Sequence, residues 1–159
     1  MMAFKKTLTA EEALQKARHY CAYQERSHQE VKEKLYGFGL RKDDVEALLG
    51  KLIEEDYLNE ERFAIQFAGG KFRMKSWGRN RIKSELKLRQ VSDYCIKKAL
   101  KEISEDDYAA AIEKLSLSKW ENLAGEEHMA RIKKTQDYLL YKGYEWEMVS
   151  RVMKSLQGK

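Results

Sequence analysis

The sequence has no proline, only two cysteines and no long apolar run, and each shortage narrows the class of protein. Strand-rich folds usually need proline and glycine at their turns, so a chain of 159 residues without proline favours an all-α fold. No stretch of about 18 apolar residues is present, so we expect no membrane-spanning segment. Residues 1–12 lack the apolar stretch and cleavage site of a secretion signal, so we expect a cytoplasmic protein.

The two cysteines lack a partner at metal-binding or disulfide-type spacing. Cys21 and Cys95 each lie among apolar or aromatic neighbours in a helical pattern, which is typical of small core residues in a reducing compartment. We therefore expect no cofactor, and no dependence of stability on a metal ion or a disulfide.

Residues suited to catalysis are few and scattered. His19, His28 and His128 have no carboxylate or cysteine constellation near them in the sequence. The acidic pairs at 43–44 and 106–107 stand where helices are predicted to begin, and the helix dipole explains them without a metal. No phosphate-binding glycine loop of the GxxxxGK type occurs. The sequence therefore predicts a protein that is not an enzyme.

Positive charge is concentrated in the middle third of the chain. Residues 58–104 hold 12 basic and 5 acidic residues, whereas residues 10–57 hold 8 and 11, and residues 105–159 hold 9 and 10. Between residues 71 and 89, eight basic residues accompany one acid: Lys71, Arg73, Lys75, Arg79, Arg81, Lys83, Lys87 and Arg89. Such a local excess indicates a contact with an anionic partner.

The same basic segment has a helical apolar pattern. Ile82 and Leu86 define an inner edge, and Arg79, Lys83 and Lys87 follow one flank at i, i+4, i+8 spacing. Like charges at this spacing repel by a few tenths of a kcal/mol per pair, so we expect this trio to matter most for binding and to be replaceable without loss of folding. The alternative is a solvated face without a function. Trp77 also lies within the segment. Two roles are open for it: stacking on a base or a partner's side chain, or anchoring the helix start in the core.

Apolar positions recur at two nearly equal offsets. Six apolar positions from Val31 to Leu52 match six from Ile82 to Ile103 at an offset of 51, and a further offset of 53 reaches Leu139 to Leu156. This periodicity predicts three tandem three-helix repeats at 1–57, 58–104 and 105–159. Units of this size bury little apolar surface alone, so we expect an elongated, slightly curved array that is monomeric.

Local signals place the helix boundaries. Capping boxes at 9–12 and 27–30 predict two helix starts, and Asp43 is predicted to cap a third helix with an apolar stripe of Val45, Leu48, Leu49, Leu52 and Ile53. Asn59 and Ser104 are predicted to open the second and third units. Gly69 and Gly70 are expected to loosen the chain before the basic segment. The third unit is predicted to have helices at 106–120, 127–141 and 147–155, with Trp120 and Trp146 as packing residues.

Several of these residues resemble those of the bacterial RecX regulatory proteins, which modulate the RecA recombinase. The resemblance extends from Ala13 to Leu156. It is carried by Arg26 and Ser27 followed by Glu30, Val31 and Leu35, by residues 57–64, and by Trp77, Gly78 and Arg79 followed by Ile82, Glu85 and Leu86. Two features depart from the family pattern: Gln90 stands where a glycine is common, and the turn at 36–39 is unusual.

The resemblance implies a helical protein that lodges in the groove of a RecA–DNA filament and restrains ATP hydrolysis and strand exchange in DNA repair and recombination. DNA would be contacted directly or through the filament. The residues themselves also allow two other classes of protein. One is a DNA-binding transcriptional regulator, in which only Asn80 is placed to read a base edge. The other is a helical scaffold that binds an acidic protein.

Overall fold

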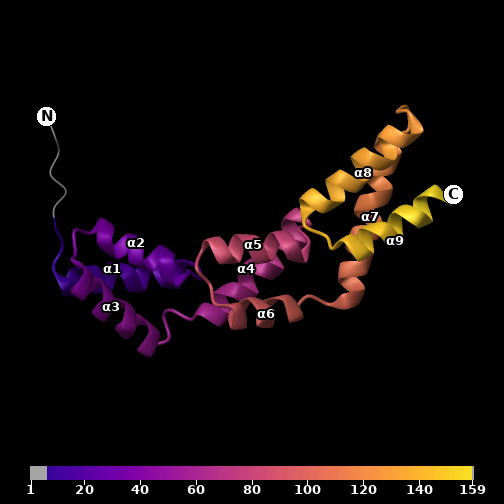
Figure 1. Cartoon of the computed structure of the whole chain (residues 1–159). Helices are drawn as coiled ribbons and strands as arrows, with labels where there is room; N and C mark the ends of the chain where they lie inside the picture. The colour runs from indigo at the N-terminus through magenta and orange to yellow at the C-terminus, as the bar shows by residue number, and fades with distance from the viewer. Residues whose placement is uncertain (1–6, 159) are drawn as a thin grey trace, which may run out of the picture. The chain divides into compact units, whose positions relative to one another are not determined.

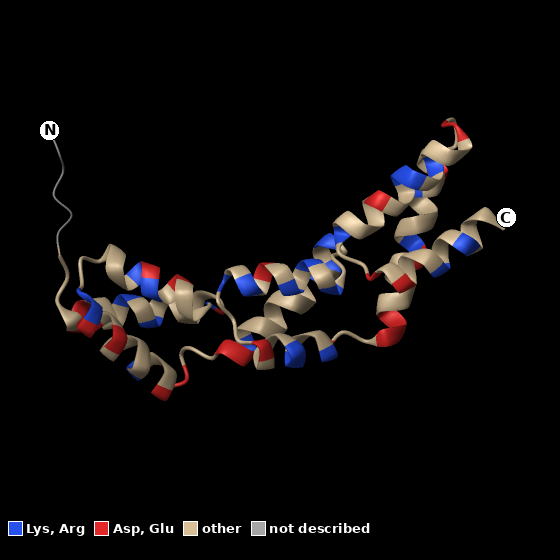
Figure 2. Cartoon of the chain, viewed as in Figure 1, with Lys and Arg blue, Asp and Glu red and all other residues tan. Residues whose placement is uncertain are grey.

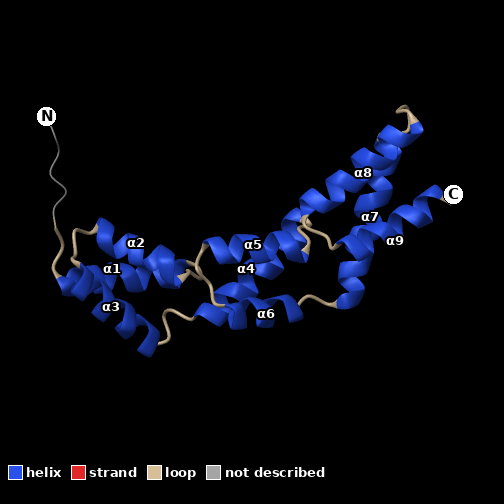
Figure 3. Ribbon diagram, in the orientation of Figure 1, coloured by secondary structure: helices blue, strands red, loops and turns tan. Residues whose placement is uncertain are grey.

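The protein is helical throughout the part of the chain that the structure, a computed structural model, describes: residues 7–158 (Figures 1 and 3). These residues contain nine α-helices and no strand. The helices are α1 (Ala10–Tyr23), α2 (His28–Gly37), α3 (Lys42–Glu54), α4 (Glu60–Lys75), α5 (Arg79–Leu88), α6 (Asp93–Lys101), α7 (Glu105–Asn122), α8 (His128–Lys142) and α9 (Trp146–Gln157). The predicted all-α class is confirmed.

Most predicted helix starts are confirmed, with one correction. Thr9 and Ser27 form the predicted capping boxes of α1 and α2, and the Ser104 side chain caps α7. The Asn59 Oδ1 atom accepts a hydrogen bond of 2.8 Å from the Arg62 N–H at the start of α4. Asp43, by contrast, is not the cap of α3. The cap position is Arg41, and Asp43 lies in the first turn, where its charge favours the helix dipole.

The paired glycines do not interrupt the chain as expected. Helix α4 continues through Gly69 and Gly70 to Lys75, and the break comes later, at residues 76–78. A Cβ atom at Gly69 would lie 2.8 Å from Nη1 of Arg73, so the glycine leaves room for the Arg73 side chain to fold back over the helix. Glycine in a helix costs about 1 kcal/mol relative to alanine, which the rest of a sixteen-residue helix offsets.

A left-handed residue follows the second helix of each repeat. Gly39, Gln90 and Gly143 have φ values of +88°, +60° and +103°. They stand after α2, α5 and α8 and are related by the same offsets of 51 and 53 as the apolar positions. Gln90 therefore adopts a conformation that glycine favours, although it carries a side chain. The shared backbone geometry supports the three-helix repeat read from the sequence.

The described chain divides into two compact units. Unit 1 comprises residues 7–66 and 86–96, and unit 2 comprises residues 67–85 and 97–158. In unit 1, helices α1, α2 and α3 pack around apolar side chains such as Val31, Leu35 and Leu52, all 0% exposed. The predicted stripe of α3 is buried except for Ile53, which lies at its edge and is 42% exposed.

Unit 2 is centred on two tyrosines. Helices α7, α8 and α9 pack together, and Tyr108 and Tyr144 are both 0% exposed, with ring centroids 5.1 Å apart. The ring of Phe72, from the end of α4, lies 5.8 Å from that of Tyr108. Each tyrosine also has a hydroxyl that must be satisfied when it is buried. The core of unit 2 is therefore filled by aromatic rings, and the hydroxyl groups on two of these rings require hydrogen-bond partners.

The remaining predictions about buried residues are confirmed for the two cysteines and Trp120 but are wrong for Trp146. Cys21 and Cys95 are buried and free, as expected. Trp120 packs against the Arg131 guanidinium, 3.9 Å from its ring centroid, and accepts that group's hydrogen bonds at its carbonyl oxygen. Trp146 was predicted to pack but is 54% exposed, because it is the first residue of α9 and lies at the end of the buried stripe.

Candidate functional site

The predicted basic segment is divided between two helices and a turn (Figure 2). Its members are Lys71, Arg73 and Lys75 at the end of α4, Trp77 in the turn, Arg79, Arg81, Lys83 and Lys87 on α5, and Arg89 just after α5. Exposure separates these residues. Arg73, Lys75, Lys83 and Lys87 are exposed, whereas Lys71, Trp77, Arg79, Arg81 and Arg89 are half-buried.

The turn before α5 is held against the turn between α8 and α9. The Gly78 N–H donates to the Lys142 carbonyl over 2.7 Å, and the Asn80 N–H donates to the Gly143 carbonyl over 2.9 Å. The Tyr144 hydroxyl donates to the Ser76 carbonyl over 2.9 Å. These bonds satisfy backbone groups that a helix start leaves unpaired, and they join two segments of unit 2 that lie far apart in the sequence.

Two glycines make this approach possible. A Cβ atom at Gly78 would lie 2.3 Å from the carbonyl carbon of Gly143, a distance that no side chain tolerates. Gly143 combines its positive φ with a site where a Cβ atom would lie 2.4 Å from Cβ of Arg81. The glycine in the Trp77–Gly78–Arg79 motif is thus required by backbone-to-backbone packing.

Arg79 is the centre of a polar network that we name the Arg79 lock: Arg79, Glu105, Tyr108 and Glu145. The Arg79 guanidinium pairs with Glu145 over 2.9 Å and with Glu105 over 2.7 Å, and it lies 3.9 Å from the Tyr108 ring centroid. The Arg79 N–H donates to the Tyr108 hydroxyl over 2.8 Å, and that hydroxyl donates to Glu145. Burial raises the pKa of Tyr108 well above its usual value, so the hydroxyl keeps its proton.

The Arg79 lock corrects one expectation about the basic flank. Arg79 was expected to lie exposed beside Lys83 and Lys87, but its side chain is only 20% exposed and its charge is paired twice. Burial of a cation is tolerated because the two carboxylates compensate it. We therefore expect replacement of Arg79 to disturb folding, which replacement of Lys83 and Lys87 should not do.

A cluster of cations and aromatic rings surrounds the turn. The Arg81 guanidinium lies 4.4 Å from the Trp77 ring centroid and 4.7 Å from that of Tyr141. The Lys71 ammonium lies 5.2 Å from the Trp77 centroid, and the ring of Phe67 meets Trp77 edge-on at 6.4 Å. Trp77 is therefore a half-buried packing residue whose ring also orients two cations.

Lys142 adds a further cation to this surface. Its Nζ atom donates to the carbonyl oxygen of Lys75, the last residue of α4. Burial, followed by the neighbouring charges of Arg81 and Lys75, lowers the pKa of Lys142 below its usual value. Arg81 and Lys75 therefore both lie close enough to Lys142 to repel its charge, and we name Lys75, Arg81 and Lys142 the cation cluster.

Sequence reasoning missed Lys142, Tyr141 and the carboxylates of the Arg79 lock. Each lies 26 or more residues from the residue that it contacts in the basic segment, as in the Arg79–Glu105 pair, and no local pattern links them. The one available signal was Gly143, which the repeat offset places at the end of a second helix. It marks a turn but does not show what the turn touches.

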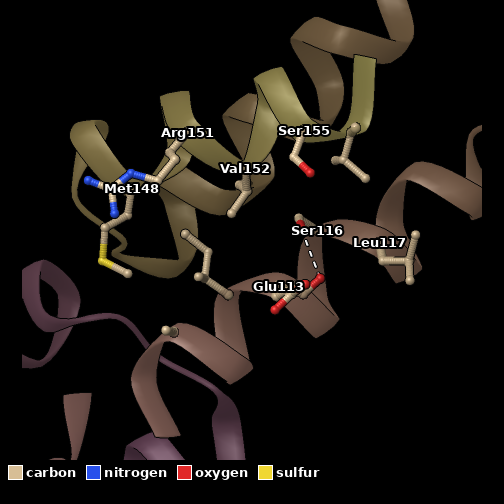
Figure 4. A pocket seen from close by; sticks show the side chains of 10 residues that line it. Glu113, Ser116, Leu117, Met148, Arg151, Val152 and Ser155 are labelled. Carbon is tan, nitrogen blue, oxygen red and sulfur yellow. Dashed lines mark hydrogen bonds between the residues drawn. The ribbon is translucent and has the colours of Figure 1, made fainter. Parts of the chain in front are cut away.

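Unit 2 also contains an apolar groove between α7 and α9 (Figure 4). The groove has a volume of about 310 Å³ and is lined by Ile112, Leu117, Met148 and Val152, with Glu113 and Arg151 among its polar residues. The Ser116 hydroxyl donates to the Glu113 carbonyl over 2.9 Å, so it satisfies the helix backbone. The lining is mainly apolar and brings together no set of residues suited to catalysis.

Residues 7–158 contain neither a metal site nor a membrane span. No group of three or more histidine, cysteine or acidic side chains in this range is placed to hold a metal ion. No described helix is both long and apolar enough to cross a membrane.

The fold is that of a helical protein made of three-helix units, and its central turn carries a concentration of positive charge. Comparison with known proteins gives the family. The family model for the second three-helix domain of RecX matches residues 59–100, and the model for the third matches residues 105–153, together more than half of the chain. The chain belongs to the RecX family of regulatory proteins.

Relatives support this assignment over most of the chain. The regulatory protein RecX of Prosthecochloris aestuarii is 28% identical over 144 residues, which cover 91% of this chain and 93% of the relative. That of Oceanobacillus iheyensis is 24% identical and covers 87% of this chain, which spans about half (51%) of the relative's length. The crystal structure of RecX from Lactobacillus salivarius matches with a TM-score of 0.84 at 20% identity and covers 94% of this chain and 97% of that chain. The structural match shows the shared fold.

Proposed function

We propose that this protein binds the RecA–DNA filament and restrains its ATP hydrolysis and strand exchange during DNA repair and recombination, including the SOS response. Membership of the RecX family makes RecA the expected partner. The single observation that carries the proposal is the exposed positive charge on α4 and α5, because a filament of protein on DNA presents repeated negative charges.

The exposed cations suit a contact with phosphates or acidic side chains. Arg73 and Lys75 at the end of α4, and Lys83 and Lys87 on α5, are exposed to solvent. Each phosphate neutralised by such a cation releases counterions, so binding should weaken steeply as salt rises. Arg79 contributes indirectly, since its lock fixes the start of α5.

A transcriptional regulator is the weaker alternative. In helix-turn-helix proteins the first residues of the recognition helix enter the major groove. Here the start of α5 packs against residues 142–144 of the same unit, and the Asn80 N–H donates to Gly143. These contacts disfavour reading of bases by α5. The other alternative, a helical scaffold that binds an acidic protein, is distinguished from a RecA modulator by the experiment below.

The test is RecA ATP hydrolysis on single-stranded DNA, titrated with this protein. We expect suppression by the wild type and a clear loss of suppression in Lys83→Glu/Lys87→Glu, which reverses two exposed charges. The matched control is Lys32→Glu/Lys51→Glu on α2 and α3, also exposed, which should keep most of the effect. A wild-type protein that leaves RecA ATP hydrolysis unchanged would contradict the proposal.

A further inference from the structure

The cation cluster is assembled from three separate segments of unit 2. Lys75 ends α4, Arg81 lies in the first turn of α5, and Lys142 ends α8. The Lys142 ammonium is fixed by the Lys75 carbonyl, and the Arg81 guanidinium is fixed between the rings of Trp77 and Tyr141. Two of the three cations, Arg81 and Lys142, therefore have restricted positions, and the exposed Lys75 side chain begins at the residue whose carbonyl Lys142 binds.

The local structure offers little compensation for this charge. Cations at the ends of α4 and α8 complement the helix dipoles, which accounts for Lys75 and Lys142 in part. Arg81, however, lies at the positive end of α5, whose first turn contains no acidic residue. The nearby Arg79 lock uses Glu105 and Glu145 for Arg79, and the ion pairs found within residues 7–158 leave out all three cluster residues.

The start of α5 does not bind an anion through its backbone. The N–H groups of residues 78, 79 and 80 donate to Lys142, Tyr108 and Gly143, respectively. An anion at this surface would therefore be held by the side chains of the cluster. Burial and then the charges of Arg81 and Lys75 lower the pKa of Lys142, and a bound anion would offset that repulsion.

We propose that Lys75, Arg81 and Lys142 form a binding site for a phosphate group of the DNA backbone, through which the protein contacts DNA directly. The proposal rests on the proposed function and deepens it, since it names the part of the filament that unit 2 touches. Arginine held in a fixed plane offers a forked pair of donors to phosphate oxygens, and lysine offers a compact charge.

Single-stranded DNA is the form of DNA that we expect at this site. The Tyr141 ring is 69% exposed and lies beside Arg81, so an unpaired base next to the bound phosphate can stack on it. Contacts of this kind do not distinguish one base from another. Binding should therefore be independent of sequence and strongly dependent on salt.

The test measures binding of fluorescent single-stranded and duplex oligonucleotides by anisotropy at several salt concentrations, without RecA. The variant is Lys75→Gln/Arg81→Gln/Lys142→Gln, which keeps polar groups of similar length. We expect about tenfold weaker binding to the single strand and a salt slope reduced by about 1 for each phosphate that the variant no longer neutralises. The control is Lys16→Gln/Lys42→Gln/Lys51→Gln in unit 1, which removes the same charge from exposed positions and should leave both quantities nearly unchanged.

Three outcomes would overturn the site. The first is a wild type that binds neither DNA form. The second is a folded triple variant, with a wild-type melting curve, that binds the single strand with wild-type affinity and slope. The third is duplex affinity that falls in the variant while single-strand affinity does not.

The two proposals can fail separately. If the protein suppresses RecA ATP hydrolysis but binds no free DNA, the filament proposal stands and the phosphate site is wrong. If it binds single-stranded DNA through the cluster but does not affect RecA, the reverse holds. If the triple variant keeps DNA binding and loses suppression, the cluster faces an acidic surface of the partner protein, and the phosphate site is also wrong.

Discussion

Units 1 and 2 are stabilised in different ways. In unit 1 the buried cluster consists of apolar side chains from Ala13 to Leu58, and Ser27, a buried polar residue there, caps its own helix. In unit 2 the largest buried side chains are Tyr108 and Tyr144, and their hydroxyls bond to Glu145 and to the Ser76 carbonyl. The hydrophobic effect is non-directional, whereas these hydrogen bonds fix positions.

This difference bears on function. In unit 1, ion pairs such as Arg18 with Glu55 and Arg62 with Glu25 lie at the edge of the apolar core. In unit 2, the residues that present Lys75, Arg81 and Lys142 to solvent are held by the Arg79 lock and by the close packing of Gly78 on Gly143. The proposed binding surface therefore depends on bonds inside the unit, and changes to those bonds should alter binding even where every cation is kept.

The largest effect is expected at Gly78. Gly78→Val places a Cβ atom 2.3 Å from the Gly143 carbonyl carbon, so the two turns must separate. We expect a loss of about 3 kcal/mol or more in the free energy of unfolding. Denaturant unfolding followed by circular dichroism measures it. A melting curve like that of the wild type would show that the close approach is not needed.

A smaller effect is expected at the Arg79 lock. Tyr108→Phe removes the hydroxyl that accepts the Arg79 N–H and donates to Glu145, and it leaves both groups partly unsatisfied. We expect a loss of about 1–3 kcal/mol in the free energy of unfolding. The matched control is Tyr23→Phe in unit 1, where the side chain is 84% exposed and the change should be close to zero. Equal stability of the two variants would contradict the directional account of unit 2.

Unit 1 should respond to pH through His28. Burial lowers the pKa of His28 below its usual value, against the opposing influence of Glu60, whose carboxylate lies 3.5 Å away. The unfolded chain then takes up this proton before the folded chain does, so the stabilisation is present above about pH 6.5 and is lost as the pH falls. Thermal melts between pH 8 and 5 should show a steeper decline for the wild type than for His28→Gln. The same slope in both proteins would show that the half-buried His28 does not contribute to the pH dependence of stability.

The smallest effect is a gain at Gly70. A Cβ atom at this position of α4 meets nothing within 4 Å, so Gly70→Ala should raise the free energy of unfolding by about 0.5–1 kcal/mol. The change also serves as a control for Gly78→Val. A loss of stability would mean that α4 needs flexibility at this point, as the sequence alone had suggested.

Local patterns predicted the helices but not the connections between distant segments. Capping boxes and apolar periodicity identified α1, α2 and the buried stripe of α3, because these signals act within a few residues. The three helices of the third repeat were predicted to within about two residues at each end. Gly69 and Gly70 were misread because the packing of α4 overrides the low helix propensity of glycine.

The site was predicted only in part for the same physical reason. The excess of positive charge from Lys71 to Arg89 is a property of one segment and was visible in the sequence. The pairing of Arg79 with Glu105 and Glu145, and the approach of Lys142 to Lys75, depend on tertiary contacts across 26 to 67 residues. Charge counting therefore could not separate Arg79, which holds the fold, from Lys83 and Lys87, which are exposed.

The most direct test of the dependence of binding on the Arg79 lock is the concentration of Glu145→Gln that half-suppresses RecA ATP hydrolysis, compared with the wild type. This variant keeps every cation and makes the protein more positive, so simple charge attraction predicts tighter binding to the filament. It also weakens the bonds of Glu145 with Arg79 and Tyr108. We predict that a folded Glu145→Gln protein requires a higher concentration than the wild type. Equal or stronger suppression would contradict the claim that the lock positions the cations.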